Sequence, residues 1–116
     1  MTVSLVLVKE ADTCWDESRR VKGRMEVPPL PSELEKILRK IAPAVAGYKP
    51  ELVYCAAGEP AVSSGRVIAE ALDVPVISCD ELVALEMGSW TGLRWQEVKE
   101  RYGRIYRKWR SCPDVY

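Results

Sequence analysis

The run Val3-Ser4-Leu5-Val6-Leu7-Val8 decides the fold class of this sequence. It is short, contains several β-branched residues and is almost continuously apolar, which is typical of a strand buried in a parallel sheet. Leu52-Val53-Tyr54-Cys55 and Pro75-Val76-Ile77-Ser78 have the same character. The sequence therefore predicts three short strands, over 3–8, 52–55 and 75–78.

Segments with helical periodicity alternate with these strands. Ser32 and Glu35 form a capping-box pattern at the start of one apolar stripe, and Pro43 is expected to bend or interrupt that helix. Two further stripes have apolar residues at helical spacing. The expected helices are 32–46, 61–72 and 94–110.

The alternation of strands and helices predicts an α/β layer with a parallel sheet. A chain of 116 residues with 47% hydrophobic residues is long enough for one domain, over 1–116, with a real core. Ligand sites in such sheets lie beyond the carboxyl ends of the strands. We call this edge the carboxyl rim; here it comprises residues 9–22, 55–60 and 79–84.

Charge and hydropathy exclude several classes of partner. Lys+Arg and Asp+Glu both number 17, so no overall field attracts nucleic acid or an anionic membrane. The longest apolar run, Val3 to Val8, is too short to span a bilayer, and its flanks do not match a signal peptide. We expect a cytoplasmic protein that binds neither membrane nor nucleic acid.

The cysteines do not form a metal-binding pattern. Cys14, Cys55, Cys79 and Cys112 lie far apart without a C-x-x-C pair, and the chain contains no histidine. We expect reduced structural thiols, no metal and no cofactor. Cys14 and Cys55 should both lie near the carboxyl rim, where a redox-sensitive disulfide is the alternative to buried inert thiols.

The last expected helix is strongly basic. It carries seven cations against only Glu97 and Glu100. Such a run is either the solvated face of an amphipathic helix or a docking patch for an acidic partner or nucleic acid. The seven are Arg94, Lys99, Arg101, Arg104, Arg107, Lys108 and Arg110.

The segment Leu5-Val6-Leu7-Val8-Lys9-Glu10-Ala11-Asp12-Thr13-Cys14-Trp15-Asp16 resembles the opening of the histidine phosphatase superfamily, the phosphoglycerate mutase-like proteins. In that family the first strand ends in Arg-His-Gly-Glu-Thr. The similarity continues in register to Gly88-Ser89-Trp90-Thr91-Gly92-Leu93 and beyond. The resemblance implies a three-layer-type phosphoglycerate mutase-like fold, truncated, with a short, mostly parallel sheet of order 3-2-1 flanked by helices. Further matching positions are Arg20, Gly23, Glu26, Pro28, 53–54, 67–72, Trp95, Glu97, Val98 and Tyr102.

The resemblance also implies a chemistry that this chain lacks the side chains to perform. In the family a histidine accepts the phosphoryl group, two arginines and a second histidine hold the phosphate, and a carboxylic acid protonates the leaving oxygen. Here Glu10 replaces the nucleophile, Lys9 the first arginine, Pro60 the second arginine and Ala84 the acid. In the family the second histidine lies later in the sequence, in a portion that these 116 residues do not include.

From these losses we expect a catalytically inactive pseudophosphatase, not an enzyme, that acts as an interaction or regulatory module. One alternative is phosphoryl transfer of the phosphatase or mutase type with residues completed by another subunit. Another is a binder of phosphorylated small ligands. Lys9 and Glu10 are expected to form an ion pair that closes the pocket in which the family binds phosphate. The alternative is that both are solvated loop charges. The ligand-binding candidates are Lys9, Thr13, Asp16, Lys22 and Gly23.

The Val3–Val8 strand also predicts a partner. With a sheet order of 3-2-1, this apolar strand is an uncovered edge, and such edges pair with other chains. We therefore expect a homo-oligomer, or a different protein partner, bound at the Val3–Val8 edge.

Overall fold

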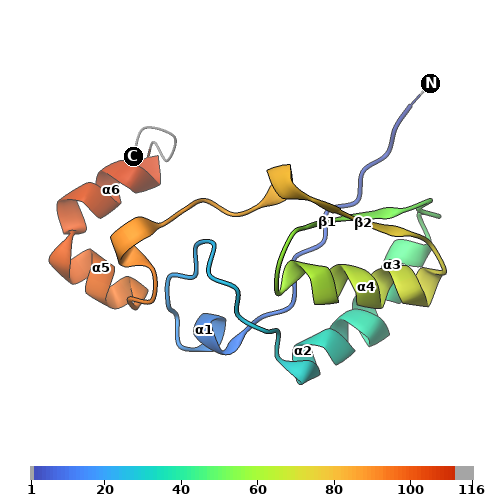
Figure 1. Ribbon diagram of the computed structural model, residues 1–116, viewed down its shortest axis with the longest axis horizontal. Coiled ribbons are helices and arrows are strands. Elements are labelled where there is room, and N and C mark those ends of the chain that lie inside the picture. The colour runs from blue at the N-terminus through green and yellow to red at the C-terminus, as the bar shows by residue number, and fades with distance from the viewer. Residues whose placement is uncertain (1, 112–116) are drawn as a thin grey trace.

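The computed structural model describes residues 2–111, and a pair of parallel strands organises one end of it (Figure 1). Strand β1, Val53–Ala56, pairs with β2, Val76–Cys79, with Val53 opposite Val76. Both lie within one residue of their expected positions. Helix α4, Ala61–Leu72, connects them and has the bounds that the sequence predicts.

A helical rod packs beside α4 on the same side of the sheet (Figure 1). It consists of α2, Pro31–Lys36, a π-helical turn, Ile37–Ile41, and α3, Ala42–Ala46. Pro43 has no N–H and its ring crowds the preceding turn, so the regular α-helical hydrogen bonds cannot continue through it. The predicted interruption is confirmed, as a wider turn that lies just before the proline.

The rod begins differently from the expected capping box. The N-cap is Leu30, no side chain caps the helix, and Pro31 occupies the first turn. Proline suits this position because its fixed φ is helical and the missing N–H would have no intrahelical partner. Ser32 is therefore already inside the helix.

The expected strand over 3–8 is wrong, and with it the sheet order 3-2-1. Among the described residues the sheet has only the two strands β1 and β2. The backbone of residues 3–8 forms no hydrogen bond to another described residue, and a strand requires such a partner. The segment is exposed, with Val3, Leu5 and Leu7 at 82%, 83% and 94% and the intervening Val6 at 39%.

The last expected helix consists of two helices. α5, Trp95–Arg101, and α6, Gly103–Ser111, meet at Tyr102, whose φ of −128° is not helical. Gly103 is costly inside a helix, which favours a break at this point. The two helices pack through a cluster of aromatic rings with centroids 5.9–6.3 Å apart. The cluster contains Trp90, Trp95, Tyr102, Tyr106 and Trp109.

The core that positions the carboxyl rim is small. Ala11, Ile37 and Ile68 form its buried centre, so it joins the segment after Glu10 to the helical rod and to α4. The remaining elements are α1, Cys14–Glu17, and two 3₁₀ turns, Asp80–Leu82 and Gly88–Trp90. Across residues 2–111, no helix combines the length and the apolar character needed to cross a membrane.

The cysteines differ partly from expectation. Cys55 is buried, as expected of a structural thiol, but Cys14 is exposed because it begins the short surface helix α1. Cys14, Cys55 and Cys79 are all free thiols. Burial raises the pKa of the Cys55 thiol. Cys112 lies outside the described residues.

Candidate functional site

The candidate site is built on the turn that follows Glu10, where Lys22 binds two carboxylates. The Lys22 ammonium lies 3.2 Å from Oε1 of Glu10 and 3.7 Å from Oδ2 of Asp16. Only 16% of the Lys22 side chain is exposed, so these charges interact through less water than a surface pair does. At the position of the family's nucleophile, the structure therefore holds a carboxylate neutralised by a lysine.

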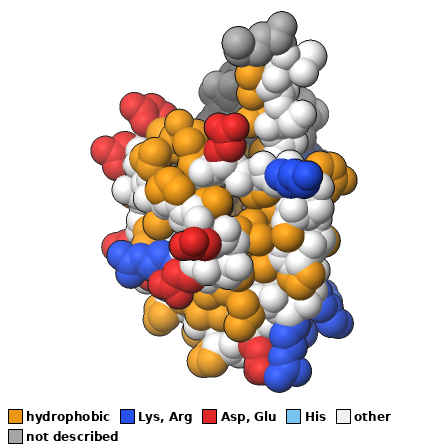
Figure 2. Space-filling view, turned by 90° about the vertical axis from the view of Figure 1, so that its right-hand side faces the viewer, with side chains coloured by type: hydrophobic (Ala, Val, Ile, Leu, Met, Phe, Trp, Pro, Cys, Tyr) orange, Lys and Arg blue, Asp and Glu red, His pale blue; other side chains and the backbone are white. Residues whose placement is uncertain are grey.

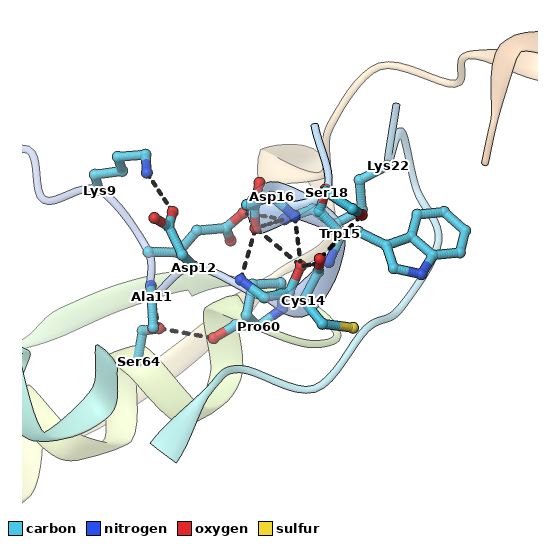
Figure 3. A network of polar contacts seen from close by, with 12 residues as sticks. Lys9, Ala11, Asp12, Cys14, Trp15, Asp16, Ser18, Lys22, Pro60 and Ser64 are labelled. Atoms are coloured by element: carbon cyan, nitrogen blue, oxygen red, sulfur yellow. Dashed lines mark hydrogen bonds and ion pairs between the residues drawn. The ribbon is translucent and has the colours of Figure 1, made fainter. Parts of the chain in front are cut away.

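The expected pair between Lys9 and Glu10 is wrong. Lys9 instead forms a 2.6 Å ion pair with Asp12, and the Lys9 side chain is largely exposed (Figure 3). Consecutive side chains in an extended segment point to opposite sides, so Lys9 and Glu10 find different partners. The hydrogen bond to Asp12 raises the pKa of Lys9.

The Thr13 and Asp16 side chains form a reciprocal cap on α1. The Thr13 amide and hydroxyl both donate to Oδ2 of Asp16, at 2.7 and 2.9 Å. Partial burial raises the pKa of the Asp16 carboxyl, but the hydrogen bonds from Thr13 and the charge of Lys22 outweigh it and leave that pKa lowered. Thr13 is fully buried, so its hydroxyl serves the cap and does not face a ligand.

Ser64 fixes the backbone beside Glu10 to the start of α4 (Figure 3). Its buried hydroxyl accepts a hydrogen bond from the Ala11 N–H at 2.9 Å and donates one to the Pro60 carbonyl at 2.8 Å. The positions of the family's nucleophile and second arginine, now Glu10 and Pro60, are thus brought together. Sequence reasoning missed Ser64, because 53 residues separate it from Ala11.

Ala84 and Gly23 lie on two segments that contact each other, which the sequence did not predict. Nε of Arg24 donates to the Ala84 carbonyl at 2.8 Å. Gly23 has a φ of +56°, and a Cβ there would lie 3.0–3.2 Å from Met87. Glycine is therefore required by both backbone conformation and space, and the turn from Lys22 to Arg24 lies close to the 84–87 segment.

A hollow of about 250 Å³ lies beside the site, between residues 9–12 and the helical rod. Its walls carry three cations, Lys9, Lys36 and Lys40, and an equal number of carboxylates. Lys9 and Lys36 are each paired with one of those carboxylates. The balance of charge gives this hollow little attraction for an anion.

The family assignment rests on residues 5–116, which match the model of the histidine phosphatase superfamily (branch 1). The chain belongs to that superfamily. Over 111 residues the chain is 27% identical to "Phosphoserine phosphatase 1" of Hydrogenobacter thermophilus. These residues make up 96% of the chain and 52% of that relative. It is 30% identical to "Metal-independent phosphoserine phosphatase" of Arabidopsis thaliana, covering 88% of the chain and 43% of the relative. The chain spans about half the length of these curated relatives.

Solved structures confirm the fold. A mycobacterial glucosyl-3-phosphoglycerate phosphatase matches with a TM-score of 0.80 at 16% identity, over 87% of this chain and 48% of the other. A phosphoserine phosphatase from Entamoeba histolytica, in complex with 3-phosphoglyceric acid, matches with a TM-score of 0.69 at 18% identity, over 78% and 44%. The expected α/β fold, with a short parallel sheet flanked by helices, is thus the histidine phosphatase fold in shortened form.

These relatives contradict the expectation that the chain is not an enzyme. Phosphatase names occur both among the curated relatives and among the structural matches, which points to an enzyme. The opposite prediction rested on the histidines and arginines that the chain lacks. The chain nevertheless carries Lys9, Glu10, Pro60 and Ala84 where the family has its reactive residues. Any reaction at this site must therefore take place with these side chains present.

Proposed function

We propose that this chain forms part of a phosphatase for small phosphate monoesters and that another subunit completes the reactive site. The observation that carries the proposal is the match of 88–96% of the chain to relatives named phosphoserine phosphatases. The chain spans only about half of each relative. Further chain is therefore needed to bring the relatives' full set of side chains to one site.

The second subunit must supply imidazole, because the chain has no histidine. An imidazole nitrogen attacks phosphorus, and the ester oxygen leaves with a proton from an acid that the second subunit must also supply, because Ala84 stands at the acid position here. Water then cleaves the phosphorus–nitrogen bond and releases phosphate. Glu10 is a poor replacement for the nucleophile, since Lys22 neutralises it and two donors of the family site are also missing.

Lys22 is the residue of this chain that we assign to phosphate binding in the completed site. It is the least exposed ammonium in the ion pairs of the described residues, and two carboxylates hold it at the rim. A phosphate dianion that approaches Lys22 exchanges these carboxylates for its own oxygens. Asp16 can turn back to the α1 cap, which needs its carboxylate in any case.

The exposed segment Val3–Val8 is the docking place that we propose for the other subunit. Val3, Leu5 and Leu7 are almost fully exposed, and the segment runs directly into Lys9 and Glu10. Figure 2 views the end of the molecule that carries this segment and shows hydrophobic side chains gathered there. A strand paired with residues 3–8 would present its own end at the rim, beside Glu10.

The test is a phosphate-release assay on the assembly purified from its native source through a tag on this chain. The substrates are an aryl phosphate and phosphoserine. We expect the tagged assembly to release phosphate, the isolated chain to release none, and Lys22→Met in the assembly to lower turnover at least about tenfold. Lys108→Met, which removes an equal charge from α6, is the matched control and should leave turnover unchanged.

Two results would count against this proposal. Absence of turnover by an assembly that demonstrably contains the chain would refute the phosphatase activity. Turnover by the isolated chain would instead show that no second subunit is needed.

A further inference from the structure

A second pocket lies between the turn after α1 and the first part of α5, and it shares no lining residue with the site around Glu10. Its volume is about 350 Å³, within the range of pockets that hold small ligands. The lining residues are Ser18, Arg19, Arg94, Trp95, Gln96 and Lys99.

The backbone fixes the two sides of this pocket to each other. The Trp95 N–H donates to the Arg19 carbonyl at 2.9 Å, and Val21 exchanges hydrogen bonds of 2.8 Å with Leu93 and Gly92. The ladder pairs Arg20 with Arg94, and it brings Arg19 and Arg94 to the same pocket although 75 positions of sequence separate them. Both guanidinium-bearing residues are thus held in place before any ligand arrives.

α5 supplies the third cation and a rigid wall. Lys99 lies four residues after Trp95 and three after Gln96, so its side chain neighbours each of them on the helix surface. Trp95 stacks on Trp109 with ring centroids 5.9 Å apart and an angle of 20° between the planes. Arg19 has a φ of +56°, an unfavourable backbone conformation for a residue with a side chain.

The charges of this pocket are all of one sign. Its lining contains three cations and no carboxylate. The two acidic residues of α5 do not line the pocket, although each contacts a residue that does. Oε1 of Glu97 accepts from the Arg94 N–H at 3.2 Å, and Oε1 of Glu100 accepts from Gln96 at 2.9 Å. Within residues 2–111, no carboxylate lies within ion-pair distance of Arg19, Arg94 or Lys99.

The surrounding charge strengthens this local excess. Residues 94–111 contain seven basic and two acidic side chains, in a chain whose net charge is zero. The hollow beside Glu10 differs, because its three cations face three carboxylates. Of the two pockets, only the one at Arg19, Arg94 and Lys99 has an electrostatic reason to take up an anion.

We propose that this pocket binds a small polyanion that carries a phosphate or diphosphate group. Two guanidinium groups and one ammonium match the charge of such a group, and arginine forks bind phosphate oxygens in pairs. Trp95 offers an apolar surface to the remainder of the ligand. The site lies outside the phosphoryl-transfer site proposed above and does not depend on it.

The test is calorimetric titration of the purified chain with pyrophosphate and with inorganic phosphate at low ionic strength. We expect pyrophosphate to bind more tightly than phosphate because it carries more charge. The double substitution Arg94→Gln and Lys99→Gln should weaken pyrophosphate binding at least about tenfold. The matched control, Arg104→Gln with Lys108→Gln, removes the same charge from α6 outside the pocket and should retain binding.

Arg19→Gly provides an independent variant, because glycine adopts the left-handed backbone without strain. It should weaken pyrophosphate binding even if the double variant fails to fold, which far-UV circular dichroism would reveal. The proposal is overturned by no heat with either probe, by unchanged binding in Arg19→Gly, or by equal losses in the two double variants. Equal losses would indicate a diffuse basic field instead of a pocket.

Discussion

Asp16 links the stability of α1 to pH. Its carboxylate accepts two hydrogen bonds from Thr13 and lies near Lys22, so its pKa is below the ordinary value of 3.8. A lowered pKa means that the stabilisation is complete above that value and is lost as the pH falls through the folded-state pKa. We expect Asp16→Asn to lower the free energy of unfolding by about 1 kcal/mol near neutral pH.

Urea unfolding of both proteins at about pH 7 and about pH 3 checks this prediction, since the difference between them should shrink in acid. Asp12→Asn is the matched control. It removes a carboxylate from an exposed pair with Lys9 and should change stability by less than about 0.5 kcal/mol. Equal losses in the two variants would show that the cap at Thr13 contributes nothing of its own.

The thiols are expected to react in the order of their exposure. Cys14 is exposed on α1, whereas Cys55 is buried and its raised pKa leaves less thiolate near neutral pH. With the other cysteines replaced by serine, a chromogenic disulfide reagent should modify Cys14 at least about tenfold faster than Cys55 in the native protein. Similar rates in denaturant serve as the control, and similar rates in the native state would contradict the described burial.

At the scale of elements, local patterns predict α4, β1 and β2 well. Pro60 precedes α4, and Asp73, with a left-handed φ of +53°, ends it. The predictions failed where the structure of a segment depends on its contacts with other segments. The apolar run at 3–8 has strand character but no strand partner among the described residues, and the last helix breaks at Tyr102, just before Gly103.

The site was predictable in its positions but not in its contacts. The alternation of strands and helices placed Glu10, Lys22 and Pro60 on one rim. In the structure Lys22 pairs with Glu10, and Ser64 links the residue after Glu10 to Pro60. The sequence could not show that Lys22 binds Glu10, because a loop of 12 residues can follow many paths. Nor could it show that Arg19 and Arg94, 75 residues apart in sequence, line one pocket.

Close packing between α4 and β1 depends on Gly65. A Cβ at this position would lie 2.9 Å from Cβ of Cys55, closer than side chains approach each other. Gly65→Ala should therefore destabilise the protein by about 1–3 kcal/mol, although alanine favours helices. Gly47→Ala is the matched control: its φ is −61° and the new Cβ would make an ordinary contact at 3.5 Å.

Thermal or urea unfolding of these two glycine variants gives the measurement. Gly47→Ala should leave stability unchanged or raise it by up to about 1 kcal/mol. Unchanged stability in Gly65→Ala would mean that α4 and β1 can separate without cost, contrary to the packing at Cys55.

At the scale of the whole molecule, the described chain is extended. Its radius of gyration is 16.2 Å, compared with about 13 Å for a compact domain of this length. The aromatic cluster of α5 and α6 lies at one end and the sheet with α4 at the other (Figure 1). Hydrophobic side chains remain exposed at the sheet end, among them Leu5, Leu7, Tyr54 and Ile77.

Such a surface predicts assembly, because exposed apolar area of this kind associates in water. Without the other subunit proposed above to cover residues 3–8, we expect the purified chain to sediment as an oligomer at micromolar concentration, with residues 3–8 at the interface. The double substitution Leu5→Asp and Leu7→Asp should shift it to the monomer, since both side chains are more than four-fifths exposed and neither supports the core. Leu38→Asp, which changes a half-exposed leucine on the helical rod, should leave the oligomer intact. Sedimentation velocity over a concentration series distinguishes these outcomes. A wild-type chain that stays monomeric throughout would refute the assembly, and a Leu38 variant that dissociates equally would place the contact outside the Val3–Val8 segment.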